Sequence, residues 1–381
     1  MTGQFQLTDD QLAIQEMAQR FTADNITPFA AEWDEKAHFP RDVIQQTGEL
    51  GFGAIYVSEE SGGIALGRLE AALIMEAMAY GCPATSAYVS IHNMAAWMID
   101  RFGSPELKER YLPKLVTMEH LASYALTEPG SGSDAAGLKT TAVVDGDHYV
   151  LNGTKQFISG SGFNDIYVVM VRTGEHKSKG ISCLVVEKDT PGLSFGKPEK
   201  KLGWNASPTA QLIFEDCRVP VANRVGAEGE GFSFAMAGLD GGRLNIGACS
   251  LGGAQRCLDE AIKYTKERQQ FGQPVADFQN TQFMLADMAT ELEAARALLY
   301  LAAAKVTENA PDKSKFSAMA KRLATDSGSN VVNNALQLFG GYGYLKEYPI
   351  ERFWRDLRVH SILEGTNQVM RMIVGRDLLR Q

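Results

Sequence analysis

The sequence lacks the features by which disulfide-bonded, metal-binding and redox-cysteine proteins are recognised. Its five cysteines show no close paired spacing, and their odd number leaves at least one unpaired. Its six histidines are scattered without a His-Glu-x-x-His pattern. We therefore expect a reduced, intracellular protein without a metal site.

Basic charge and long apolar runs are also missing. The net charge of −9 argues against a nucleic-acid-binding protein, which needs a basic face to neutralise phosphates. Apolar stretches such as 298–304 fall far short of the roughly 20 residues that cross a bilayer, so no membrane association is expected. The N-terminus carries Asp9 and Asp10 rather than a basic leader. We expect no targeting peptide and a cytoplasmic location.

The chain begins with helical signals alone. Thr8 followed by Gln11 forms a capping box, and apolar residues recur at helical spacing from there toward Pro28. Further helical patterns cover residues 69–80 and 104–115. The first 120 residues or so are therefore expected to be helical.

A region of β-branched segments follows. Residues 140–144, 166–171 and 181–186 have the composition of strands. Asp145-Gly146 and Asn152-Gly153 are dipeptides typical of hairpin turns. This part of the chain is expected to form a β domain.

Long helical patterns return after Gly231. They suggest an antiparallel bundle and run over residues 244–268, 278–307, 315–338 and 368–379. A helical, β, helical order differs from the alternating pattern of a doubly wound fold. At 381 residues the chain would usually form two or three domains. We predict an α+β protein with an N-terminal α-helical domain over 1–120, a middle β domain over 121–230 and a C-terminal four-helix-bundle domain over 231–381.

Two runs far apart in the chain carry the functional signal. The first is Tyr124-Ala125-Leu126-Thr127-Glu128-Pro129-Gly130-Ser131-Gly132-Ser133-Asp134. Its small side chains, hydroxyls and backbone donors suit a flavin edge and pyrophosphate, with an ordinary polar loop as the alternative. A nicotinamide site is disfavoured because Gly137 comes too late for Gly-x-Gly-x-x-Gly. The second run, Ser361-Ile362-Leu363-Glu364-Gly365-Thr366-Asn367-Gln368, contains a carboxylate that could otherwise only complement a helix dipole.

Together these runs resemble the acyl-CoA dehydrogenases, flavoenzymes that use FAD and whose catalytic base is the Glu of a Glu-Gly-Thr motif. The resemblance covers nearly the whole chain and implies the fold of that family. It implies that Glu364 removes the proton α to the thioester carbonyl while the β-hydrogen leaves as hydride to the flavin. Some branched- and long-chain relatives carry the catalytic Glu at the position of Gly242, so the base here falls to Glu364.

The resemblance also implies which residues bind the cofactor. Phe157 would cover the isoalloxazine ring, where a buried strand residue is the alternative. Arg268 and Phe271 would reach FAD across a subunit interface, where an exposed helix-end Arg is the alternative. The implied FAD-binding residues are Tyr124, Leu126, Thr127, Gly132, Ser133, Phe157, Ile158, Ser159, Arg268, Phe271, Phe278, Gln279, Gln337, Leu338, Phe339, Gly340, Gly341, Thr366, Asn367 and Gln368.

A further set of residues would bind the substrate. Asp240 and Arg243 would contact the coenzyme A portion, and Arg376 would approach its nucleotide phosphate. The alternative for Asp240 and Arg243 is a helix-start acid and a nearby surface base. The implied substrate-binding residues are Ser133, Asp240, Gly241, Gly242, Arg243, Leu363 and Arg376.

The acyl group is indicated by three short segments. Residues 91–94, 203–205 and 359–365 are most similar to family members that convert isobutyryl-CoA to methacrylyl-CoA in valine catabolism. Straight-chain relatives usually have Tyr where this chain has Leu363, and the missing ring leaves room for a methyl branch. One methyl in an apolar pocket is worth only ~1–3 kcal/mol, so a short-chain or 2-methylbutyryl-CoA dehydrogenase is the nearest alternative.

The resemblance further implies an acyl-CoA substrate, electron-transferring flavoprotein as electron acceptor and a homotetramer. An acyl-CoA oxidase that returns electrons to oxygen is the enzymatic alternative. A flavin-free acyl-CoA-binding scaffold is the non-enzymatic alternative.

Overall fold

The computed structural model describes residues 6–380, which form helices at both ends of the chain and a β-sheet between them. The N-terminal helices are α1 Asp9–Asn25, α2 Ala30–Lys36, α3 Arg41–Gln46, α4 Arg68–Gly81, α5 Pro83–Phe102 and α6 Pro105–Val116. The Thr8 hydroxyl accepts from the Gln11 N–H at 3.2 Å, and the Gln11 side chain accepts from the Thr8 N–H at 3.0 Å. The predicted capping box is therefore confirmed.

The middle of the chain forms a mixed sheet with strand order β6-β7-β3-β2-β4-β5-β8, and β1 pairs with β4. The strands are β1 Ala122–Ala125, β2 Thr141–Asp145, β3 His148–Ser159, β4 Ile166–Arg172, β5 Ile181–Glu187, β6 Leu193–Phe195, β7 Thr209–Pro220 and β8 Arg224–Val225. The helical, β, helical fold class is thus confirmed.

One of the two predicted hairpin turns is wrong. Gly146, with φ of 64°, lies in the turn between β2 and β3, as expected. Gly153 instead lies inside β3 at a register shift against β7. Its φ is 146°, and an added Cβ would lie 2.6 Å from the Thr140 hydroxyl. A bulge and a turn both favour glycine for the same steric reason, so the dipeptide alone could not separate them.

The long C-terminal helices follow the predicted ranges closely, except that the first begins earlier and a short helix, α10, was not predicted. The helices of this part are α7 Gly231–Glu267, α8 Gln279–Thr307, α9 Lys313–Phe339, α10 Ile350–Leu357 and α11 Asn367–Leu378, with a small hairpin of β9 Gln269–Gln270 and β10 Gln273–Pro274 after α7. Helix α7 begins at Gly231 rather than at residue 244. Glycines in its first turns weaken helix propensity, but tertiary packing overrides that preference.

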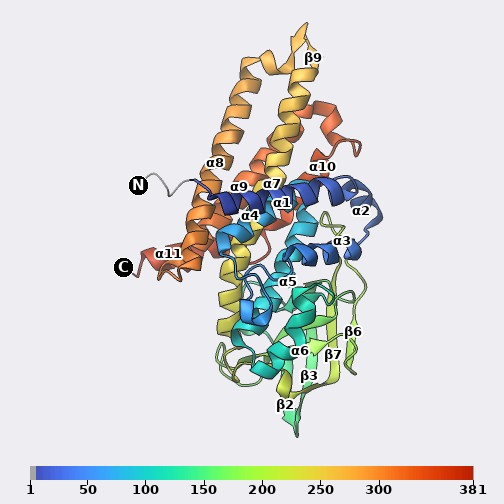
Figure 1. Ribbon diagram of the computed structural model, residues 1–381, viewed down its shortest axis with the longest axis vertical. Helices are drawn as coiled ribbons and strands as arrows, with labels where there is room; N and C mark the ends of the chain where they lie inside the picture. Colours follow the sequence, from blue (N-terminus) through green and yellow to red (C-terminus); the bar gives the residue numbers. More distant parts are fainter. Residues whose placement is uncertain (1–5, 381) are drawn as a thin grey trace.

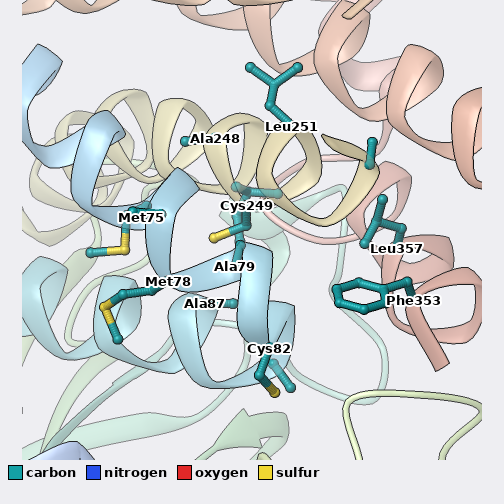
Figure 2. Close-up of a cluster of buried hydrophobic side chains, with 14 of the residues drawn as sticks. Met75, Met78, Ala79, Cys82, Ala87, Ala248, Cys249, Leu251, Phe353 and Leu357 are labelled. Atoms are coloured by element: carbon teal, nitrogen blue, oxygen red, sulfur yellow. The ribbon is translucent and has the colours of Figure 1, made fainter. Parts of the chain in front are cut away.

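The largest core lies where α4, α5, α7 and α10 meet. Figure 2 shows Met75 from α4, Ala87 from α5, Cys249 from α7 and Phe353 from α10 packed around this junction. At Gly252 the helices approach closely, since an added Cβ would lie 2.1 Å from the Glu76 carbonyl oxygen. Such close packing holds α7 rigidly through the centre of the molecule.

Helix α7 connects two ends of the molecule (Figure 1). At one end α7 and α8 extend to the β9–β10 hairpin, and the β-sheet occupies the opposite end. Among residues 6–380, no helix combines the length and the apolar character that crossing a bilayer requires. The same residues contain no group of three or more His, Cys, Asp or Glu placed to hold a metal ion. All five cysteines are buried and free.

Candidate active site

Glu364 lies in the turn that leads into α11 and has a left-handed backbone, with φ of 53°. Gly365 follows with φ of 90°. A non-glycine residue in this conformation is held there by its surroundings, often at a functional site. Its Oε2 atom is buried and has no hydrogen-bond partner among the described residues. A buried, unpaired carboxylate oxygen suggests that its partner arrives as a ligand.

The backbone of α7 lies directly against this carboxylate. A Cβ added at Gly242 would lie 2.3 Å from Glu364 Oε2, so a side chain at 242 would occupy the position of the carboxylate. Positions 242 and 364 therefore face the same small space from two elements. This geometry explains why an acidic residue could serve that space from either position, but not from both.

Two cations lie near Glu364. The Arg243 Nε atom donates to the Glu364 carbonyl oxygen at 3.4 Å, and its Nη1 atom lies 2.8 Å from Asp240 Oδ1. The Lys321 ammonium donates to the Gly365 carbonyl oxygen at 2.9 Å. These bonds hold the turn around Glu364 from α7 on one side and α9 on the other.

Burial and the nearby positive charges shift the pKa of Glu364 in opposite directions. Burial raises the pKa of Glu364 to about 7, and Arg243 and Lys321 only partly oppose that rise. Burial lowers the pKa of Lys321 to about 8, against the attraction of Glu364. A carboxylate with a pKa near 7 is suited to accept a proton at neutral pH.

Some of the predicted substrate residues lie near one another beside the first half of α7. Asp240 and Arg243 are 7% and 5% exposed and lie inside the helix, so their interpretation as a helix-start acid and a surface base is wrong. Ser314, at the start of α9, donates to Asp240 Oδ2 at 2.5 Å. Next to it Lys315 pairs with Asp377 at 2.8 Å, which brings the last turn of α11 to the same place. Arg376 lies exposed in that turn.

The predicted flavin loop is anchored to the sheet by a buried ion pair. Lys155 is fully buried, and its ammonium donates to the Leu126 carbonyl oxygen at 3.2 Å and to Glu128 Oε1 at 2.8 Å. The Gln156 N–H donates to the Thr127 carbonyl oxygen at 2.8 Å. These contacts fix the part of the loop that precedes Ser133.

The same loop leaves space and donors for a ligand. An added Cβ at Gly130 or Gly132 would meet nothing within 4 Å, so the backbone there is open to approach. The nearby Tyr124 hydroxyl is buried without a hydrogen-bond partner among the described residues. Both features fit a bound cofactor.

The structure contradicts the alternative interpretation of Phe157, which was a buried strand residue. Its side chain is 64% exposed, and its φ of 59° places it at a bulge in β3. Ile158 is buried beside it, and the Ser159 carbonyl oxygen accepts from the Ser123 hydroxyl at 2.6 Å. The bulge turns an aromatic ring outward from a rigid sheet.

A second group of cofactor candidates lies at the opposite end of the molecule, beside the β9–β10 hairpin (Figure 1). A cavity of about 400 Å³ is lined there by Arg268, Gln337, Leu338, Phe339, Gly340, Gly341 and neighbouring residues. An added Cβ at Gly340 or Gly341 would meet nothing within 4 Å. Phe271 is 95% exposed, with its ring centroid 6.1 Å from that of Phe278, which directly precedes Gln279 at the start of α8. An arginine, open glycines and an aromatic ring fit the adenosine and phosphate portions of FAD.

The last three candidates have different surroundings. The Thr366 hydroxyl caps α11 by accepting from the Val369 N–H at 3.2 Å. Asn367 is buried and bonded to Lys321 and to Asp326, at 2.9 and 2.7 Å. Gln368 is exposed. The Asn367 side chain thus stabilises the turn that carries Glu364.

Two lysines of the site were missed from the sequence. Lys321 lies between Ala318 and Ala324 on the buried face of α9, and Lys155 lies in a strand. A lysine at an apolar position of a helix is a signal that could have identified Lys321. Its partners are more than forty positions away, so the sequence could not name them.

Comparisons with known proteins found relatives that match nearly the whole chain. It is 58% identical over 373 residues to the mitochondrial isobutyryl-CoA dehydrogenase of Dictyostelium discoideum and 55% identical over 375 residues to that of Bos taurus. Each match covers 98% of this chain and 90% of the relative.

These relatives contradict the expected cytoplasmic location. Both are named as mitochondrial. The expectation depended only on the composition of the N-terminal residues, which is a weaker indication than near full-length similarity, and it is corrected here.

Solved structures have the same fold. Butyryl-CoA dehydrogenase from Megasphaera elsdenii is 40% identical, with a TM-score of 0.96, and the match covers 99% of this chain and 100% of that one. A structure from a study of the electron transferring flavoprotein of Acidaminococcus fermentans is 44% identical, with a TM-score of 0.97 and the same coverage. PigA with FAD and proline is 32% identical, with a TM-score of 0.95 and the same coverage.

Three family models account for nearly all of the chain. They are the N-terminal, middle and C-terminal domains of acyl-CoA dehydrogenase, which match residues 8–119, 123–217 and 229–379. The open flavin loop, Arg268 at its cavity and the Glu364 carboxylate with its buried Oε2 atom fit an enzyme of this kind. The chain belongs to the acyl-CoA dehydrogenase family, whose members dehydrogenate acyl-CoA thioesters with FAD as cofactor.

Proposed function

We propose that this protein converts isobutyryl-CoA to methacrylyl-CoA with Glu364 as the catalytic base. The observation that carries the proposal is the Glu364 carboxylate, whose buried Oε2 atom has no hydrogen-bond partner among residues 6–380 and whose pKa burial raises to about 7. The bond between the α-carbon and its hydrogen breaks, and Glu364 takes the proton. FAD, when bound, supplies the redox chemistry by accepting the hydride that leaves the β-carbon.

Other residues have supporting roles in this proposal. The Glu364 backbone N–H donates to no acceptor in the described part of the chain, so it is free to stabilise negative charge on the thioester oxygen. Asp240, Arg243 and Arg376 would hold the coenzyme A portion beside the first half of α7. Phe157 would exclude water from the reacting atoms.

Isobutyryl-CoA is the proposed substrate because of Leu363 and the two mitochondrial relatives. Leu363 packs against the main core beside the catalytic turn. Anaerobic titration of the purified protein with isobutyryl-CoA, with butyryl-CoA in parallel, tests the assignment through bleaching of the flavin absorption band. Bleaching that favours isobutyryl-CoA would support it, and no bleaching with isobutyryl-CoA would refute it.

Leu363→Tyr should shift the preference toward butyryl-CoA. A ring at this position would fill the space proposed for the methyl branch, which predicts a loss of about tenfold or more in kcat/KM for isobutyryl-CoA relative to butyryl-CoA. Leu363→Met is the matched control, because it keeps an apolar side chain of similar volume. An unchanged ratio in Leu363→Tyr would remove Leu363 from the selection of the acyl group.

The pH profile of kcat/KM provides a second test of Glu364. Only the ionised carboxylate can accept the proton, so kcat/KM should rise with pH and level off above about 7. Lys321→Met removes a cation that lowers the pKa of Glu364, so the rise should move to higher pH by about one unit. Lys321→Arg keeps the charge and should stay near wild type. Lower activity without a shifted profile in Lys321→Met would contradict this electrostatic role.

We further propose a homotetramer that passes electrons to electron-transferring flavoprotein. One chain carries its flavin-loop residues and its Arg268 group at opposite ends (Figure 1), which supports a cofactor site completed by a second subunit. If sedimentation shows a monomer that still holds one FAD per chain, that result would contradict a cofactor site shared between subunits. Stoichiometric peroxide formation in air, without need of the flavoprotein, would indicate an oxidase instead.

A further inference from the structure

Arg68 is a buried cation that the proposed mechanism does not use. It lies at the start of α4, is only 8% exposed and has no carboxylate within 4.0 Å among residues 6–380. Its guanidinium carbon lies 3.6 Å from the ring centroid of Tyr56 and 5.4 Å from that of Trp97. Buried charges are normally paired, so this one calls for an explanation.

Arg68 lies beside the reacting centre. An added Cβ at Gly241 would lie 2.3 Å from Arg68 Nη1, just as one at Gly242 would lie 2.3 Å from Glu364 Oε2. The guanidinium and the carboxylate thus press against adjacent positions of α7. Both positions are glycine, which gives the two side chains room against the helix backbone.

A cluster of polar side chains extends from Arg68 along α7. Asn245 is fully buried; its amide nitrogen donates to the Ser90 hydroxyl at 3.0 Å and to the Tyr56 hydroxyl at 3.4 Å, while its Oδ1 atom has no partner among the described residues. Burial raises the pKa of Tyr56, and the positive charge of Arg68 opposes that rise. We call Arg68, Tyr56, Asn245 and Ser90 the polar wall.

The wall lies close to Glu364 along α7. Asn245 follows Gly242 by three residues, which is roughly 4.5 Å along a helix axis. The thioester must place its α-carbon at the Glu364 carboxylate, so an acyl tail that follows α7 reaches the wall after a few carbon atoms. Glu364 is close enough that its charge also raises the pKa of Tyr56, after burial as the larger cause.

We propose that the polar wall ends the acyl pocket and that the Arg68 guanidinium excludes longer apolar acyl chains. This inference rests on the proposed function, because it concerns how that site selects its acyl group. A long apolar tail would cover the guanidinium and offer it no hydrogen-bond acceptor, which is unfavourable for a charge. A four-carbon branched group would stop short of it.

The test compares kcat/KM for hexanoyl-CoA and isobutyryl-CoA in the wild-type holoenzyme and in variants. Arg68→Met has similar length without charge and should raise the hexanoyl-to-isobutyryl ratio by about tenfold or more. Arg68→Lys keeps the charge and should hold the ratio within about threefold of wild type. Arg256→Met is the matched control, because Arg256 also lies over a tyrosine ring, 5.2 Å from Tyr80, but pairs with Glu260 farther along α7.

Two results would overturn the inference. A parallel fall for both substrates in Arg68→Met, with the ratio unchanged, would assign Arg68 a purely structural role. If the wild type turns over glutaryl-CoA and Arg68→Met does not, Arg68 binds an acyl carboxylate instead of excluding apolar chains. If the wild type prefers butyryl-CoA, the substrate assignment fails separately, and the hexanoyl-to-butyryl ratio then tests the wall.

Discussion

Glu364→Gln is expected to lower kcat for isobutyryl-CoA by roughly 10²–10⁴-fold while leaving a folded, yellow protein. The amide has nearly the shape of the carboxylate but cannot accept the α-proton. Because Oε2 has no hydrogen-bond partner among residues 6–380, the substitution breaks no bond there. Losing a buried ionisable group also costs the fold little, since burial already disfavours its charge.

The measurement is steady-state turnover together with FAD content and circular dichroism. Glu119→Gln is a suitable control, because that side chain is 62% exposed and pairs with Lys114 at the surface. Near-normal turnover in Glu364→Gln would exclude Glu364 as the base. A colourless or unfolded variant would instead show that the carboxylate supports the fold or the cofactor, which its surroundings do not predict.

Lys155→Met is expected to destabilise the protein by about 3–5 kcal/mol and to reduce its FAD content. Lys155 and Glu128 are 0% and 7% exposed at their side chains and lie 2.8 Å apart. Removing the cation leaves the buried Glu128 charge without its ion-pair partner, and the Lys139 and Thr140 N–H groups, which donate to it at 2.6 and 2.9 Å, compensate it only in part. It also releases the Leu126 carbonyl oxygen, so the loop expected to bind the flavin loses its anchor to β3.

Thermal unfolding and the ratio of flavin to protein absorbance would measure both effects. The double variant Lys155→Met with Glu128→Gln removes both charges and should recover part of the lost stability, which separates the charge effect from lost packing. Lys114→Met breaks an exposed pair and should change little. Unchanged melting temperature and FAD content in Lys155→Met would contradict the anchoring role.

Local signals in the sequence predicted local structure well. The Thr8 capping box and the Gly146 hairpin turn each depend on residues within three positions of each other, and both are confirmed. Gly153 and the start of α7 were predicted wrongly, because a strand pairing and helix packing decided them. Interactions with distant residues outweigh local preference at such positions.

The same division applies to the site. The Glu-Gly-Thr motif identifies Glu364 as a candidate base from adjacent residues alone. The surroundings of Glu364 come from segments more than forty residues away. Gly242 and Arg243 lie on α7 and Lys321 lies on α9, and none of them offers a hydrogen bond to its Oε2 atom. Arg68 and Lys155 gave no signal as parts of a site, because a single basic residue in a sequence is usually at the surface.

By itself the sequence determined the family, the order of helical and β regions, and the candidate chemical groups. Only the tertiary structure decided that Asp240 and Arg243 are buried together, that Phe157 faces outward, and that the flavin loop and the Arg268 group lie at opposite ends. It alone also places the pKa of Glu364 at about 7. The physical reason is that desolvation and charge interactions depend on distances in space, which distances along the chain do not specify.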